Sequence, residues 1–212
     1  MNKFIKYSVV TTALMMFAGG ASAAAFCSAG NPNPDGMSTA DVKYNGIDSD
    51  DCYGVVVDND STALINSTLN LWGASTTAWS FLAKDDGPGV TDTGIFSSIN
   101  FDLTAATGTS GLWTLTGTPI APATLPIYLD FIVVLKASDR FGAWLLDDVV
   151  FDGSDGGTWA INFTKPTGNP NNPGSITPDL SHLSLYVRDG TPPPAPDQIA
   201  IQVEFPNQPA CC

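Results

Sequence analysis

The chain has very little glutamate and few basic residues. Of its 21 acidic residues only Glu204 is a glutamate, and lysine and arginine together number 8. Glutamate and lysine are common on exposed helices, whereas aspartate and glycine suit turns and threonine suits strands. This shortage, beside 20 glycines and 16 prolines, predicts an all-β chain: an antiparallel β-sandwich or jelly-roll-like domain with little helix.

The shortage of basic residues also bears on partners. The formal net charge is −13. Binding to nucleic acid phosphates needs clustered lysine and arginine, so we expect no nucleic acid partner.

The sequence has no motif that is typical of a catalytic site. His182 is its one histidine, and the sequence contains neither a Gly-x-Ser-x-Gly elbow nor a Cys-x-x-Cys pair. His182 falls on the polar side of a predicted strand, where a hydrogen-bonded structural histidine is commoner than a general base. Neighbouring aspartates are frequent, but nothing selects one pair as the two carboxylates of a glycosidase. We therefore expect no enzyme and no catalytic residue.

Beyond the N-terminus, no apolar run approaches the length of a membrane span. Residues 1–23 have the three parts of a signal peptide: Lys3 and Lys6, an apolar run over residues 9–17, and small residues that end at Ala23. The run is shorter than the roughly 20 residues of a membrane span. The sequence predicts an exported protein without a span. A lipid anchor on Cys27 is the competing interpretation, and the bulky Phe26 before it argues against that.

Four cysteines fit an oxidising, extracytoplasmic destination and allow three pairings. We predict a Cys27–Cys52 disulfide, because a bond between the adjacent Cys211 and Cys212 would be strained. The terminal pair is then free, intermolecular or tied back to the N-terminal region.

Apolar segments recur about every ten residues over residues 24–190, a spacing typical of a sandwich domain. Two long segments, residues 127–135 and 141–150, flank the polar turn from Ala137 to Arg140 and predict a central hairpin. Residues 61–71 could form a short helix. Other strands are predicted over residues 42–47, 52–57, 79–84, 95–103, 112–115, 158–164 and 182–188.

A proline-rich linker over residues 191–197 separates this domain from the C-terminal residues 198–212. There Ile199, Ile201 and Val203 alternate with polar residues, which predicts an amphipathic strand. The strand could complete its own sheet or add to another copy of the chain.

Calcium is the metal that the composition favours, since oxygen ligands are abundant. The alternative is that these aspartates are solvated turn residues. The candidate ligands, which lie in two closely spaced groups, are Asp48, Asp50, Asp51, Asp58 and Asp60.

Tryptophans could stack on sugar rings. Four of the five lie in strand-like segments and are predicted to be buried. Trp72, followed by Gly73, is the predicted exposed one and the candidate ligand-binding residue.

Several motifs occur together in a distinctive order: DCYG at 51–54, NDS at 59–61, WSFLAK at 79–84, GLWTL at 111–115, FIVVLKA at 131–137, WLLDD at 144–148 and LSHLSLYVR at 180–188. In these the chain resembles the exported domains of PEP-CTERM proteins over roughly residues 42–190. The resemblance implies a secreted Gram-negative β-sandwich linked to exopolysaccharide and biofilm matrix.

The resemblance ends before the C-terminus. Members of that group close with Val-Pro-Glu-Pro, an apolar helix and a basic cluster, and this sequence instead has the proline linker and the Cys211-Cys212 pair. The resemblance therefore implies release, or retention by another contact. We expect a non-catalytic structural or adhesive component of the cell surface, extracellular matrix or biofilm, with matrix polysaccharide or copies of itself as partners. The alternative is a calcium-supported carbohydrate-binding module.

Overall fold

The computed structural model describes residues 24–27, 32–87, 92–168 and 174–193, and these form an all-β sandwich. This confirms the predicted fold class. The signal peptide, most of the linker and the C-terminal strand with Cys211 and Cys212 lie outside the described residues. Among the described residues no helix is long and apolar enough to cross a membrane.

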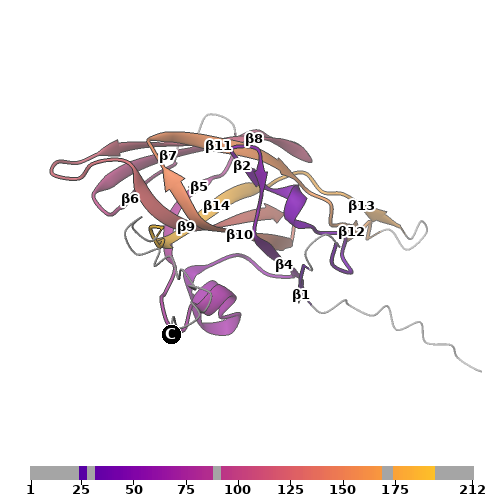
Figure 1. Ribbon diagram of the computed structural model, residues 1–212. Helices are drawn as coiled ribbons and strands as arrows, with labels where there is room; N and C mark the ends of the chain where they lie inside the picture. Colours follow the sequence, from indigo (N-terminus) through magenta and orange to yellow (C-terminus); the bar gives the residue numbers. More distant parts are fainter. Residues whose placement is uncertain (1–23, 28–31, 88–91, 169–173, 194–212) are drawn as a thin grey trace, which may run out of the picture.

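The larger layer is a six-stranded antiparallel sheet with the strand order β1-β4-β10-β9-β14-β5 (Figure 1). Its strands, from one edge to the other, are β1 (Ala25–Phe26), β4 (Asp51–Val56), β10 (Arg140–Phe151), β9 (Ile127–Ala137), β14 (His182–Asp189) and β5 (Ser80–Asp85).

The second layer is a four-stranded antiparallel sheet with the order β11-β8-β7-β6. Two short hairpins, β2–β3 and β12–β13, stand beside the layers. The remaining bounds are β11 (Ser154–Ala160), β8 (Ser110–Pro119), β7 (Ile99–Ala105), β6 (Asp92–Phe96), β2 (Lys43–Tyr44), β3 (Ile47–Asp48), β12 (Lys165–Pro166) and β13 (Ser175–Ile176).

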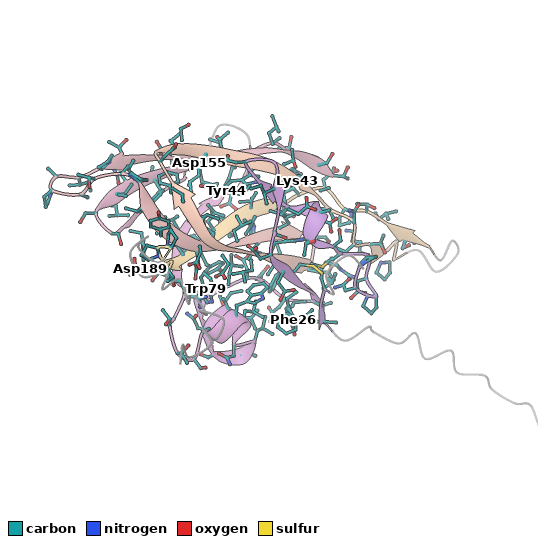
Figure 2. The ribbon with its side chains drawn as sticks, viewed as in Figure 1. Phe26, Lys43, Tyr44, Trp79, Asp155 and Asp189 are labelled. Atoms are coloured by element: carbon teal, nitrogen blue, oxygen red, sulfur yellow. A yellow bond between two sulfur atoms is a disulfide. The ribbon has the colours of Figure 1, made fainter. Side chains whose placement is uncertain are left out.

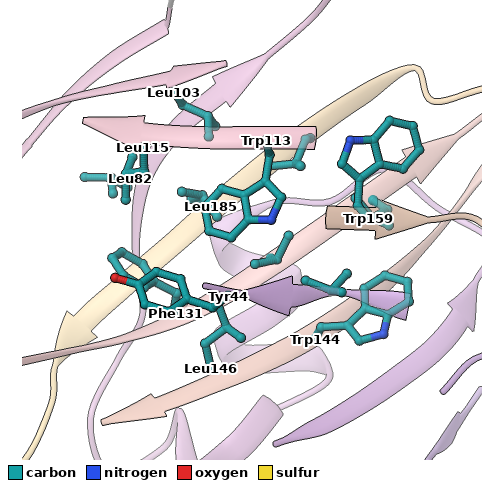
Figure 3. Packing of buried hydrophobic residues seen from close by; sticks show 14 of the residues in the cluster. Tyr44, Leu82, Leu103, Trp113, Leu115, Phe131, Trp144, Leu146, Trp159 and Leu185 are labelled. Carbon is teal, nitrogen blue, oxygen red and sulfur yellow. The ribbon is translucent and has the colours of Figure 1, made fainter. Parts of the chain in front are cut away.

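The main core fills the space between the two sheets. Trp113 and Trp159 come from the four-stranded sheet, and Phe131 and Trp144 come from the six-stranded sheet (Figure 3). All four are at most 1% exposed. Because only one face of the smaller sheet packs on this core, residues of β7 and β8 alternate between buried and exposed positions.

The predicted central hairpin is confirmed. β9 and β10 pair through the register Arg140↔Ala137, and every residue of β9 from Leu129 onward is buried. A strand that is buried on both faces has a continuous run of apolar residues in its sequence, and this is the pattern seen here.

The outer face of this hairpin has its own cover. After β4 the chain forms two short helical segments, η2 (Leu64–Thr68) and η3 (Leu71–Gly73), which lie on the side of the six-stranded sheet away from β7 and β8 (Figure 1). Ile65 and Leu71 are fully buried there in a second core cluster with Ile132 of β9. The predicted helix over residues 61–71 is thus wrong in length: it is broken at Asn70, which has a positive φ of 48°.

One predicted strand is wrong. Residues 95–103 alternate apolar and polar side chains, but the chain reverses at Ser97 and Ser98, which both have positive φ. β6 and β7 therefore pair as a hairpin, with Phe96 opposite Ile99. Ile95 is consequently 67% exposed, although it shares the apparent period of the buried residues of β7.

The predicted first strand also differs from the structure. Residues 42–47 form the turn-linked β2–β3 pair rather than one strand, because Asn45 and Gly46 adopt positive φ.

The predicted disulfide is confirmed. Cys27 and Cys52 are bonded with a Cα–Cα distance of 5.1 Å. The bond fastens the N-terminal segment to β4, next to the β1–β4 pairing.

Candidate functional site

Three aromatic side chains gather on the outer face of the six-stranded sheet, at its β1–β4 edge. Phe26 and Tyr53 are register partners, with ring centroids 4.7 Å apart, and the ring of Trp72 lies 6.1 Å from that of Phe26. Phe26 is 51% exposed, and Figure 2 labels it on the lower side of the molecule. We call Phe26, Tyr53 and Trp72 the aromatic cluster. The Cys27–Cys52 disulfide joins the residues that follow Phe26 and precede Tyr53, so it holds two members in place.

Trp72 was the tryptophan expected to be exposed, and it is half-buried. Its backbone has a positive φ of 45°, and its indole Nε1 donates a hydrogen bond of 2.9 Å to Asp51 Oδ2. The other four tryptophans are buried, as predicted: Trp79, Trp113, Trp144 and Trp159.

Arg188 connects the aromatic cluster to a group of acids. Its Nη1 donates to the carbonyl oxygen of Trp72 at 2.8 Å, and its Nε donates to Asp130 Oδ2 at 2.7 Å. The guanidinium also lies 4.1 Å from the ring centroid of Trp79, a cation–π contact. Arg188 is therefore fixed on three sides.

The acid group consists of Asp130, Asp147 and Asp148, whose carboxylate oxygens can all lie within 4.8 Å of one another. A bulge in β10 between Leu146 and Val149 brings Asp147 and Asp148 to this position. At the bulge Asp148 has a positive φ of 49°, and its N–H donates to Asp130 Oδ1 at 2.8 Å. Carboxylates at such a spacing are a donor set that suits calcium, although acids also gather on surfaces without an ion.

The short distances among the carboxylates of the acid group affect the pKa of Asp147. Burial, followed by the negative charges of Asp130, Asp148 and Asp50, raises the pKa of Asp147, and Arg188 opposes this only in part. The repulsion disfavours the charged form of Asp147 in the folded protein. A cation bound here would relieve that repulsion.

The predicted calcium ligands are not gathered into one site. Each carboxylate instead has a partner of its own, and none belongs to the acid group. Asp48 pairs with Lys43, Asp50 accepts from the N–H of Asp147, Asp51 accepts from Trp72, Asp58 accepts from the N–H of Asn59, and Asp60 binds His182 and Tyr186.

Asp130, Asp147 and Asp148 were not among the ligands predicted from the sequence. Asp130 is 17 positions before Asp147 in the sequence, and only the β9–β10 register brings them together. One signal was present in the sequence: Asp130 lies within a mainly apolar strand, where a buried charge needs partners, and it is only 5% exposed.

A hollow of about 350 Å³ lies beside the acid group. Ile47 and Val150, which are 73% and 46% exposed, line it together with Asp147 and Asp148. The hollow therefore combines apolar walls with an acidic rim.

His182 is placed on the outer face at the other edge of the same sheet. Its Nε2 lies 2.7 Å from Asp60 Oδ1, and Tyr186 donates its hydroxyl to Asp60 Oδ2 at 3.0 Å. Burial alone would raise the pKa of Asp60, but the hydrogen bonds and charge of His182 outweigh it, and the pKa is lowered. Burial and the neighbouring Asp60 raise the pKa of Tyr186, so its hydroxyl stays protonated and donates.

Comparison with known proteins gives no relative: no protein-family model, no curated protein and no solved structure matches this chain.

Proposed function

We propose that this protein is an exported, non-catalytic structural or adhesive component of the surface, extracellular matrix or biofilm of a Gram-negative bacterium. The observation that supports this most is the aromatic cluster, in which a half-exposed phenylalanine packs on a tyrosine and a tryptophan at the edge of a rigid sheet. Aromatic side chains held together at a surface are typical of sites that contact other molecules.

The surroundings of the cluster support a contact role. The disulfide, the hydrogen bond from Trp72 to Asp51 and the fixed Arg188 all restrict its side chains before any partner binds. A surface that is already ordered loses less conformational entropy on binding. The Cys27–Cys52 bond also agrees with export, since disulfides persist in oxidising compartments.

The proposal is tested by retention of the purified, processed protein on matrix isolated from the producing bacterium. Phe26→Ala should lower the retained fraction, because it removes the exposed ring of the cluster. Ile95→Ala is the matched control, since Ile95 is an exposed apolar residue of β6 in the other sheet. If both variants are retained as well as the unchanged protein, the aromatic cluster does not contribute to matrix binding.

Self-association is the second part of the proposal. The Cys27–Cys52 bond leaves Cys211 and Cys212 without these two partners, and both lie outside the described residues. If they link copies, non-reducing gels show multimers that disappear with reductant and in a Cys211→Ser/Cys212→Ser variant. A monomer under both conditions would contradict covalent self-association.

A calcium-supported carbohydrate-binding module is the alternative function. The observation that favours it is that Arg188 bonds both to Asp130 of the acid group and to the backbone carbonyl of Trp72, which links a candidate cation site to the segment that carries an aromatic ring. In that case calcium should raise the melting temperature of the protein and tighten glycan binding. Asp148→Asn should abolish both effects while keeping the bulge, because asparagine tolerates positive φ. Asp102→Asn, on the exposed face of β7, is the matched control.

A further inference from the structure

A second hollow, of about 510 Å³, lies on the outer face of the six-stranded sheet at its β14–β5 edge. The loop that follows β4 forms one wall with Asn59 and Asp60, and the two strands form the floor with Phe81 and His182. Its volume falls in the range of roughly 300–1,000 Å³ that small-molecule sites occupy. We call it the His182 hollow.

The apolar part of this hollow is an aromatic surface. Phe81 of β5 is the register partner of Tyr186 of β14, and their rings meet edge to face with centroids 5.6 Å apart. Phe81 is 49% exposed whereas Tyr186 is buried, so Tyr186 supports one side of the phenylalanine ring and the rest of Phe81 meets the solvent. A supported, half-exposed aromatic ring is the feature that binds the apolar face of a sugar ring.

The polar part of the hollow surrounds that ring. His182 Nε2 is engaged by Asp60, whereas its Nδ1 lies 3.6 Å from Asp86 Oδ1, too far for a good hydrogen bond, so Nδ1 can bond to a ligand hydroxyl. Lys84 is held by an ion pair of 2.8 Å with Asp86. The hydroxyls of Ser61 and Thr62 and the amide of Asn59 line the same hollow. Donors and acceptors thus surround one aromatic face.

The charges in the hollow are balanced locally. Asp60, which lines the hollow, is bound by His182 and Tyr186, and the ammonium group of Lys84 is paired with Asp86, so the charged side chains of the lining each have a partner. A strongly charged ligand would have to break one of these pairs. An uncharged polyhydroxylated ligand can instead form hydrogen bonds with the donor and acceptor atoms that these pairs leave unused.

The geometry points to the His182 hollow as a binding site for one ring of an uncharged glycan, stacked on Phe81 and hydrogen-bonded by His182, Lys84 and Asn59. The site is separate from the aromatic cluster, which lies at the opposite edge of the same sheet. It gives the protein a sugar contact of its own, which needs neither calcium nor the acid group.

The site has a selective probe. His182 is the only histidine in the chain, so its ring resonances in an NMR spectrum report on this hollow without overlap from another histidine. The protein is titrated at constant pH with short uncharged oligosaccharides of glucose, of mannose and of galactose. At least one of these should shift the His182 resonances in a saturable way.

Variants locate the binding. Phe81→Ala should weaken binding by at least about tenfold through loss of the aromatic contact. Asn59→Ala, an exposed loop substitution that leaves the core intact, should weaken it less and guards against a misfolded Phe81→Ala. Ile95→Ala is the matched control, because Ile95 is an exposed apolar residue of β6 that lies outside both the hollow and the aromatic cluster.

The outcomes separate this site from the proposed function. If no probe shifts the His182 resonances, or if Phe81→Ala and Asn59→Ala both bind as tightly as the unchanged protein, the inference is overturned. If Phe26→Ala lowers matrix retention while Phe81→Ala and Asn59→Ala bind oligosaccharide as tightly as the unchanged protein, the aromatic cluster is supported and the hollow is overturned. Loss of oligosaccharide binding with Phe81→Ala alone would support the hollow and leave the cluster without a glycan role.

Discussion

At the scale of single residues, the aspartates have two kinds of environment. Burial would raise the pKa of Asp60, but the surrounding donors outweigh it and the pKa is lowered, whereas burial and the neighbouring acids together raise the pKa of Asp147. Their effects on stability are therefore opposite in sign. The sequence shows many aspartates, but their environments depend on residues up to 126 positions away, as for Asp60 and Tyr186, so it could not separate the two kinds.

Asp60→Asn should lower the free energy of unfolding near neutral pH by about 1–3 kcal/mol, because His182 and Tyr186 lose a charged acceptor in a place where Asp60 is only 5% exposed. A lowered pKa means that the contribution is complete above the ordinary value of 3.8 and is lost as the pH falls through the folded-state pKa below it. Denaturant unfolding as a function of pH checks this. An unchanged stability near neutral pH would show that Asp60 is not a structural acceptor.

Asp147→Asn should raise the free energy of unfolding near neutral pH, since it removes a charge that Asp130, Asp148 and Asp50 repel. A raised pKa costs stability above the folded-state value, and below the ordinary 3.8 the cost is absent, so the gain should disappear in acid. Asp102→Asn removes one charge outside the acid group and serves as the control. A gain of the same size in both variants would reflect net charge alone.

At the scale of elements, the strands that the sequence predicted well are those with long apolar runs. The predicted bounds of β9 and β10 lie close to the observed ones, because a strand that is buried on both faces has a continuous run of apolar residues. The β6–β7 hairpin was missed because its turn residues, Ser97 and Ser98, are neither glycine nor proline. In addition, a turn of two residues does not interrupt the alternation of apolar and polar residues along the sequence. The acid group was missed for a related reason, since it depends on a bulge and on strand register.

The central hairpin should be the most sensitive element. Phe131→Ala in β9 should lower the free energy of unfolding by about 3–5 kcal/mol, because Phe131 is fully buried between the sheets. Leu112→Ala in β8 is the control: Leu112 is 65% exposed and should change stability by no more than about 0.5 kcal/mol. Chemical denaturation compares the two. Similar losses in both variants would contradict the assignment of β9 to the centre of the core.

The N-terminal segment should depend on its disulfide. Cys27 and Cys52 are 25 residues apart, and a loop of that size stabilises the folded state by about 3 kcal/mol when it is closed. Reductant should remove this contribution equally from the unchanged protein and from Cys211→Ser/Cys212→Ser. Unfolding curves with and without reductant test this, and a loss confined to the unchanged protein would assign the effect to the terminal pair.

At the scale of the whole molecule, the six-stranded sheet has one face in the main core and an outer face with two surfaces. The aromatic cluster lies at the β1–β4 edge, the His182 hollow lies at the β14–β5 edge, and the segment with η2 and η3 packs between them on the central strands. Composition was enough to predict the all-β sandwich. It could not predict these surfaces, because each combines residues from separate parts of the chain.

We propose that the protein acts by binding matrix, and sedimentation with isolated matrix is the sharpest test of this role. The purified, processed protein is mixed with matrix from the producing bacterium and centrifuged, beside a Phe26→Ala/Phe81→Ala variant that alters both outer-face surfaces. We predict that the unchanged protein sediments with the matrix and that the variant, folded to the same melting temperature within a few degrees, stays largely in the supernatant. Unchanged protein that remains in the supernatant would contradict the claim.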